Sequence, residues 1–269
     1  MPLSTPGQAP LSVDLLQGRL SLQLLPPGPY SAVDPVLSHT QGIALERQRG
    51  VHAIGSDRRR DFDTWPGVLA YTPAGVQVFS ESQQGGEYLV ARWSDALSPD
   101  APAPAHRRLE SAGHAAALAL GRQLRRMVLD PNRDLGALEE LALRFIGLQT
   151  ASRGAAPESL RSPGYARVLD RIRAEFDRPL RLSDLAAAQN KTALRFLREF
   201  RQAVGMTPHA FLVETRVQAA RRLLAHTDLP LSAVAFDCGF AHQSHMGAAF
   251  RSVLAMTPMA YRRAFSARR

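Results

Sequence analysis

The last third of the chain contains one motif twice, and this repeat constrains the fold more than any other feature. The segment 182–186 (LSDLA) returns 49 residues later as 231–235 (LSAVA), and 206–208 (MTP) returns 50 residues later as 256–258. One inserted residue in a predicted turn reconciles the two offsets. A repeat of this kind predicts two copies of a single helical unit.

The positive charge is concentrated in the repeated segment. Residues 153–269 contain 19 basic and 9 acidic residues, whereas residues 1–152 contain 14 basic and 15 acidic ones. The net charge of +9 therefore arises entirely from the carboxy-terminal part. A duplicated basic unit needs a repetitive, acidic partner, and double-stranded DNA has that character.

The composition also indicates in which cellular compartment the protein is expected. Cys238 is the only cysteine, so an intramolecular disulfide is excluded and a reducing cytosol is expected. Asp14 and Arg19 interrupt the apolar runs near the start, and no basic leader precedes them, which argues against a signal peptide. No uncharged apolar stretch reaches the length of a bilayer span. These features predict a soluble cytoplasmic protein without a membrane partner.

The first half is expected to be rich in short strands separated by glycine and proline. They are predicted at Arg19–Leu25, Gly42–Gln48, Val68–Tyr71, Val76–Ser80 and Glu87–Trp93. This spacing favours a β-sandwich or a small barrel. Helices are predicted over about residues 106–129 and 134–149, and they either cap the β-domain or form a dimer contact. A linker over 153–164 would separate domains 1–152 and 165–269.

The first copy of the repeat predicts a helix-turn-helix. Ser183 is expected to cap a short helix, Asn190 to supply a left-handed turn, and Thr192 to cap the next helix. Phe196 and Phe200 then lie on one face of that second helix. The 100° step per residue places Leu194, Arg198 and Arg201 on the other face, with Arg195 beside them.

The second copy repeats this plan, with Ser232 as cap, Gly239 at the turn, and Met246 and Phe250 as the buried pair. Ser244, Ala248 and Arg251 are then exposed, and Gln243 projects from the start of the helix. Cys238 is interpreted as a small buried turn residue in preference to a redox sensor. A helix after Thr207-Pro208 is expected to hold the two units apart, so that the reading helices enter successive major grooves about 34 Å apart.

Specific residues give this segment a family resemblance. A Gly-Phe pair, a Gln-Ser-His run and a Phe-Arg pair occur at 239–240, 243–245 and 250–251, and the connecting helix carries Arg216, Ala220 and Leu223-Leu224. In these positions the chain from about Tyr165 to Arg263 resembles the DNA-binding domain of the AraC/XylS family of bacterial transcription regulators. The resemblance covers about a hundred residues.

The resemblance implies roles for single residues. Base-edge contacts would fall on Leu194, Leu197 and Arg198 in the first reading helix, and on Gln243, Ser244 and His245 in the second. Phosphate contacts would fall on Arg195, Arg201 and Arg251. The alternative, in which these side chains only solvate a helical bundle, is disfavoured by the repeat and the charge asymmetry together.

Two positions depart from the family pattern. Ala241 stands where a capping serine is usual, and Ala248 stands where a basic residue is common. Ala248 is the repeat counterpart of Arg198, so the second reading helix lacks the side chain best suited to hold guanine. We therefore expect the first half-site to carry more of the sequence discrimination.

By the same resemblance the first half is expected to be a cupin-like β-barrel that binds a small effector. The fold class is then α+β: a β-rich barrel with two following helices, and an all-α domain of two helix-turn-helix units joined by a helix. Five aromatic residues either line an effector pocket or form the barrel core. They are Trp65, Tyr71, Phe79, Tyr88 and Trp93.

A metal-dependent cupin enzyme is the competing interpretation of this half. Such sites need several imidazoles with a carboxylate, and His39 and His52 are the only histidines before His106, with no His-x-His pair. We interpret both as ordinary surface or strand histidines. No catalytic residue, metal site or cofactor is expected.

The sequence as a whole predicts a DNA-binding transcription regulator and not an enzyme. Promoter DNA and RNA polymerase would be its partners, and an effector or partner acting on the first half would bias operator occupancy. A homodimer and a small-molecule effector are left open, as are a cupin enzyme fused to a DNA-binding domain and a DNA-binding protein without an effector.

Overall fold

The computed structural model describes residues 10–97, 107–111, 115–148 and 163–266. The chain divides into two compact units, Met1–Pro157 and Glu158–Arg269, and each is described by itself. Most of the linker expected over 153–164 lies outside the described residues, and the first helix of the second unit begins at Pro163.

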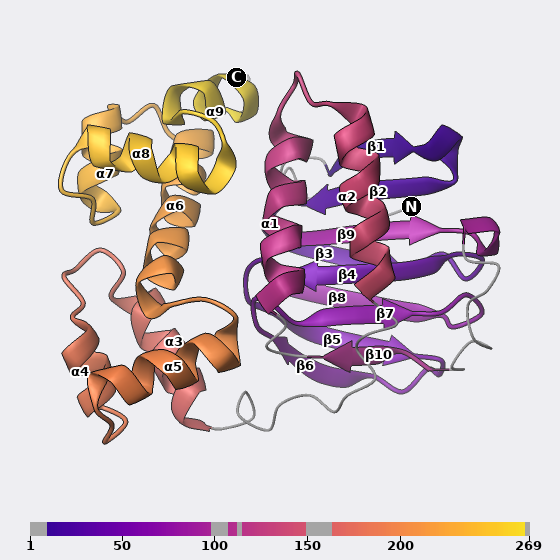
Figure 1. Cartoon of the computed structure of the whole chain (residues 1–269), viewed down its shortest axis with the longest axis horizontal. Coiled ribbons are helices and arrows are strands. Elements are labelled where there is room, and N and C mark those ends of the chain that lie inside the picture. The colour runs from indigo at the N-terminus through magenta and orange to yellow at the C-terminus, as the bar shows by residue number, and fades with distance from the viewer. Residues whose placement is uncertain (1–9, 98–106, 112–114, 149–162, 267–269) are drawn as a thin grey trace. The chain divides into compact units, whose positions relative to one another are not determined.

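Two antiparallel sheets make up most of the first unit (Figure 1). Six strands form the larger sheet in the order β1-β2-β9-β4-β7-β10, and four form the smaller one in the order β3-β8-β5-β6. The strands are β1 Leu11–Leu15, β2 Leu20–Leu25, β3 Gly28–Val33, β4 His39–Ala44, β5 Gln48–Ile54, β6 Arg60–Thr64, β7 Leu69–Thr72, β8 Val78–Gly85, β9 Tyr88–Trp93 and β10 Leu109–Ser111.

The expected cupin-like barrel is not confirmed, because the described strands close no barrel. The larger sheet ends at β1 and β10, and the smaller one ends at β3 and β6. A mixed architecture with a β-rich first unit and an all-helical second one is what the structure supports.

The apolar core of the first unit lies on one face of the larger sheet. In β2, Leu20, Leu22 and Leu24 are at most 3% exposed, whereas the alternating Ser21 and Gln23 are half-buried. The period of two along a strand separates these sets onto opposite faces. The leucine face is the one that the following helices cover.

Helices α1 (Ala115–Leu129) and α2 (Leu135–Gly147) lie over that face (Figure 1). A Cβ added at Gly121 of α1 would lie 2.8 Å from the Ile43 side chain, so α1 packs tightly against β4. The Gln41 side chain donates a 2.5 Å hydrogen bond to the Phe145 carbonyl of α2. Of the two alternatives for these helices, the structure shows the one in which they cover the sheet.

A buried ion pair also holds α1 in place. The Arg125 guanidinium donates to the Glu87 carboxylate at 3.0 Å, and both side chains are at most 1% exposed. Because a lone charge in such surroundings costs several kcal/mol, each group depends on the other.

The sequence-based assignments differ from the structure at several elements. Strands β1, β3 and β6 are not among the predicted ones, and β8 extends to Gly85, beyond the predicted end at Ser80. The predicted helix over 106–129 begins only at Ala115, because Leu109–Ser111 pairs with β7 as the edge strand β10. The predicted strand Gly42–Gln48 is divided between β4, which ends at Ala44, and β5, which begins at Gln48.

His39 is not a surface histidine. It is 5% exposed, its Nε2 contacts the Asp95 carboxylate, and its Nδ1 accepts a 2.8 Å hydrogen bond from the Tyr71 hydroxyl. With both ring nitrogens engaged, it is a satisfied strand histidine.

The second unit is helical (Figure 1). Its helices are α3 Pro163–Ala174, α4 Leu182–Ala187, α5 Ala193–Val204, α6 Pro208–His226, α7 Leu231–Asp237, α8 Gln243–Leu254 and α9 Pro258–Phe265. The long helix α6 contacts α5 as well as α7, α8 and α9, so it connects the two copies of the repeat. Among the described helices of both units, none has the length and apolar character needed to span a membrane.

Candidate nucleic-acid interface

The first helix-turn-helix consists of α4, a tight turn and α5. Asn190 in the turn has φ +53°, as expected for a residue that ends one helix before the next begins. The Thr192 hydroxyl accepts from the Arg195 N–H and caps α5. Phe196 and Phe200 are fully buried. The expected cap at Ser183 is wrong: α4 begins at Leu182, so Ser183 lies inside the helix and bonds to Asp184.

The second helix-turn-helix consists of α7, a turn and α8. Gly239 in the turn has φ +74°, and a Cβ there would lie 2.7 Å from the Asp177 carbonyl oxygen. Glycine is therefore required both by conformation and by close approach. The expected cap at Ser232 is wrong, because α7 begins at Leu231.

The N-cap of α8 is His242, a role that sequence reasoning missed. Its Nδ1 accepts from the His245 N–H at 3.1 Å and contacts the Ser244 hydroxyl at 2.7 Å. Fifty residues separate His242 from Thr192, so the repeat itself aligns the two caps. The offset could have shown that Ala241 is not the capping position.

The predicted base-reading residues fall on the solvent-facing sides of α5 and α8. Leu194 is 66% exposed, Arg198 is exposed, and Leu197 is half-buried. In α8 the first three residues are all exposed. They are Gln243, Ser244 and His245. Their contacts with DNA bases stay a prediction.

The predicted phosphate-contacting arginines differ in their surroundings. Arg195, Arg201 and Arg251 are all exposed. The Arg195 guanidinium is already paired with Glu199 at 2.8 Å, one turn along α5. In the described residues no such carboxylate partner holds Arg201 or Arg251.

Glu199 is the centre of a small polar cluster. It accepts from the Arg195 Nε, from the Lys191 ammonium at 2.5 Å and from the Tyr165 hydroxyl at 3.0 Å. These hydrogen bonds, that of Arg195 first, lower the pKa of Glu199 to about 2. The cluster joins α3, the turn and α5, and it places one carboxylate on the edge of α5.

The connecting helix α6 is fixed to its surroundings by polar side chains. The Arg216 guanidinium donates to the carbonyl oxygens of Phe176 and Arg178, at 2.7 and 3.0 Å. The Arg221 guanidinium lies 5.2 Å from the Tyr261 ring centroid of α9. Arg216, one of the residues behind the family resemblance, thus contacts backbone of its own unit.

Cys238 is buried beneath the turn of the second unit, with 1% exposure. Burial raises the pKa of its thiol to about 12. The thiolate is the reactive form of cysteine. The structure therefore supports the interpretation of Cys238 as a small packing residue.

The five aromatic residues that were expected to line an effector pocket or form the barrel core lie in different surroundings. A pocket in the described residues is lined by Trp93 but by none of the other four. Trp65 packs under the Arg47 guanidinium and Phe79 under that of Arg59, while Tyr71 and Trp93 stack near His39. Tyr88 projects from the opposite face of β9 to Trp93. Among the described residues, no cluster of three or more His, Cys, Asp or Glu could hold a metal ion.

Comparison with known proteins places this geometry in a family. A family model described as a helix-turn-helix domain matches residues 185–264. The probable transcriptional regulator LumQ of Photobacterium leiognathi is 31% identical over 90 residues, and the transcriptional activator NphR of Rhodococcus sp is 39% identical over 87. These matches cover 34% and 32% of this chain but only 36% and 26% of the relatives' own length.

A solved structure gives a similar match. It is the DNA-binding domain of AdpA, a global transcriptional factor, in complex with a target DNA, and it is 32% identical in sequence. The match covers 39% of this chain and 94% of that chain, with a TM-score of 0.37. Two helix-turn-helix units on one connecting helix define a double helix-turn-helix domain. Residues 185–264 are, more narrowly, a helix-turn-helix domain of the AraC type.

Proposed function

We propose that this protein is a sequence-specific DNA-binding transcription regulator in which α5 and α8 read bases and exposed arginines contact phosphates. The observation that carries the proposal is the exposure of corresponding faces on α5 and α8, two helices capped at the same position of the repeat within an AraC-type domain. Neither face is covered by another described element of the second unit, so both are accessible to a partner.

The dimensions of α6 support a contact with two grooves. A helix of 19 residues is about 28 Å long, at about 1.5 Å per residue. One turn of duplex measures about 34 Å. A rigid connector of this size suits two reading helices that enter successive major grooves on one side of the DNA.

The amino-terminal unit would control this activity. An effector or protein partner that prefers one conformation of the full chain would change operator occupancy by its difference in affinity for the two states. RNA polymerase and a second copy of the chain are further partners in this proposal. The first unit would then be regulatory and not enzymatic.

The test uses the full chain and random genomic fragments. Bound fragments are selected at about 150 mM salt, where contacts to phosphates alone are weakened. We expect enrichment of a short sequence with two half-sites about one helical turn apart. Uniform recovery of all fragments would contradict sequence-specific recognition, although it would leave general DNA binding intact.

A further inference from the structure

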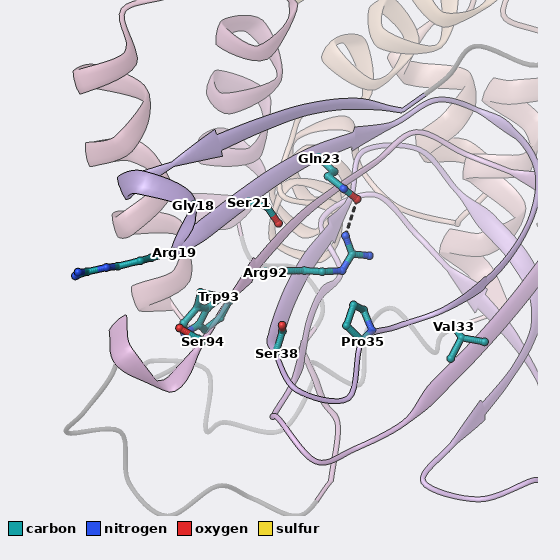
Figure 2. Close-up of a pocket in the computed structure, with 10 residues that line it drawn as sticks. All are labelled: Gly18, Arg19, Ser21, Gln23, Val33, Pro35, Ser38, Arg92, Trp93 and Ser94. Carbon is teal, nitrogen blue, oxygen red and sulfur yellow. Dashed lines mark hydrogen bonds between the residues drawn. The ribbon is translucent and has the colours of Figure 1, made fainter.

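The first unit contains a polar pocket on the face of the larger sheet that the helices do not cover. It has a volume of about 480 Å³ and lies between β2 and β9 of the larger sheet and the end of β3 (Figure 2). Pockets that bind small molecules have volumes of about 300–1,000 Å³. The size therefore suits a small organic ligand.

Arg92 is the central side chain of this pocket. It projects from β9 on the face opposite to Trp93, and Ser21 is its cross-strand partner on β2. Figure 2 shows Arg92 extending across the pocket toward Gln23, with Ser38 on the adjacent loop. Its side chain is 18% exposed, so its charge is largely withdrawn from water.

The Arg92 guanidinium is held in position but not saturated. One terminal nitrogen donates to the Gln23 amide oxygen at 2.6 Å, and the other donates to Asp34 at 3.1 Å. Its Nε is buried without a hydrogen-bond partner in the described residues. Each terminal nitrogen has two N–H donors and uses one of them in these bonds, so one N–H on each remains for a ligand.

The polar side chains that line the pocket are rich in donors. They comprise three serine hydroxyls, one amide and two guanidinium groups, and no carboxylate is among them. Asp34, which is not part of the lining, forms an ion pair with Arg92. The exposed Arg19 adds a second positive charge at the rim of the pocket, and Figure 2 shows its side chain extending away from Arg92. Such surroundings suit a ligand that accepts hydrogen bonds and carries negative charge.

We propose that this pocket binds a small organic anion, a carboxylate or a phosphate monoester, through Arg92. The planar guanidinium matches both groups, since each presents two oxygens in one plane to a pair of N–H donors. Binding itself requires only the first unit. A role for this ligand in gene control rests in addition on the proposed function.

The experiment is calorimetric titration of the full chain with two pairs of probes. Benzoate is compared with benzamide, and glycerol 3-phosphate with glycerol, so that each pair differs in the charged group. We expect saturable binding of at least one anion and binding of its neutral counterpart that is about tenfold weaker or more, because hydrogen bonds to charged groups are the stronger ones. The anion that binds distinguishes a carboxylate from a phosphate source.

Variants assign the binding to this pocket. Arg92→Gln should lower the affinity for the anion by about tenfold or more. Arg58→Gln removes the same charge from an exposed loop outside the pocket and should leave the affinity unchanged. If Arg92→Gln does not fold, Ser21→Leu serves instead, because it fills the pocket and keeps both partners of Arg92.

Three results would overturn the proposal: no binding of either anion at millimolar concentration, equal binding of the neutral probes, or wild-type affinity in both pocket variants. DNA affinity is measured separately on ligand-free protein. Specific DNA binding without anion binding would refute the pocket and leave the proposed function intact. Anion binding without sequence-specific DNA binding would refute the proposed function alone.

Discussion

Glu199 and Arg195 form an ion pair 2.8 Å long on the exposed side of α5, one turn apart. The same carboxylate also holds Lys191. Two cations next to the proposed DNA surface are thus engaged by one acid. For Arg195 to contact a phosphate, this pair must be exchanged for the DNA backbone.

Glu199→Gln should therefore strengthen DNA binding. The change removes a negative charge beside the proposed DNA surface and releases Arg195 and Lys191 for phosphates. Each additional phosphate contact steepens the dependence of log K on log salt by about 0.9, so we expect a slope steeper by about 1–2. Fluorescence anisotropy titrations at several salt concentrations measure it, on cognate and random duplexes alike.

Glu175→Gln is the matched control, because Glu175 forms a similar ion pair with Arg171 on α3. It should change the slope less than Glu199→Gln does.

The pKa of Glu199 lies at about 2, below its ordinary value. The ion pairs of the Glu199 carboxylate are therefore complete above about pH 4.5 and are lost as pH falls toward 2. The gain from Glu199→Gln should thus be the same at about pH 8 and about pH 5. Equal slopes in both variants would contradict this role.

Arg198 and Arg201 should separate base reading from phosphate contact. Arg198→Ala should cost about 1–3 kcal/mol on the cognate site and relax specificity at one position. Arg201→Ala should weaken all sequences alike and reduce the salt slope by about 1. Competition with single-base variants of the selected site measures both effects. If the two variants behaved identically on cognate and random DNA, the assigned division of roles would be wrong.

A substitution at Ala248 should increase the affinity for DNA sites with guanine in the second half-site. Ala248 is exposed on α8 at the position that Arg198 takes on α5, fifty residues earlier. Ala248→Arg should strengthen binding to sites with guanine at the facing position by about 1–3 kcal/mol, since a bidentate arginine–guanine contact has that value. Selection from a DNA library randomised in the second half-site measures this preference for guanine. Ala248→Gln is the neutral control, and selection of the same bases by all three proteins would place Ala248 away from the groove.

The sequence predicts the turns and part of the helix caps of the helical repeat, but it does not predict the long-range pairing of the strands. Thr192, Asn190 and Gly239 were predicted from residue type alone, because caps and left-handed turns depend on neighbours within a few residues. Ser183 and Ser232 were wrong as caps, since each helix begins one residue before the serine.

Strand β10 was missed because its only support is pairing with β7, some forty residues away in the chain. The aromatic residues do not predict the pocket, because Tyr88 and Trp93 are five positions apart on one strand and so face opposite ways. Arg92 faces the side of the sheet away from the core, and only the pairing of β2 with β9 brings it beside Ser21. Such register is not visible in one strand's sequence.

His242 should be replaceable by other capping residues. His242→Ala removes the acceptor for the His245 N–H and should lower stability of the second unit by about 1 kcal/mol. His242→Asn and His242→Ser should retain most of the stability, because both are good N-caps. Urea unfolding measures the stability, and binding to sites altered in either half measures the effect on α8. A stable His242→Ala protein with unchanged DNA binding would show that the cap is dispensable.

Ala255 is the strained counterpart of Gly205. Both end a reading helix in the left-handed conformation, with φ +59° and +79° respectively. A side chain in this region costs about 1–2 kcal/mol. Glycine removes that cost but lowers stability by about 0.5–1 kcal/mol through the greater freedom of the unfolded chain. The first effect is the larger, so Ala255→Gly should stabilise the second unit by up to about 1 kcal/mol, as measured by urea unfolding. Gly205→Ala should show the opposite sign. If Ala255→Gly were destabilising, Ala255 would make contacts that outweigh its strain, and the two copies of the repeat would not be equivalent at their ends.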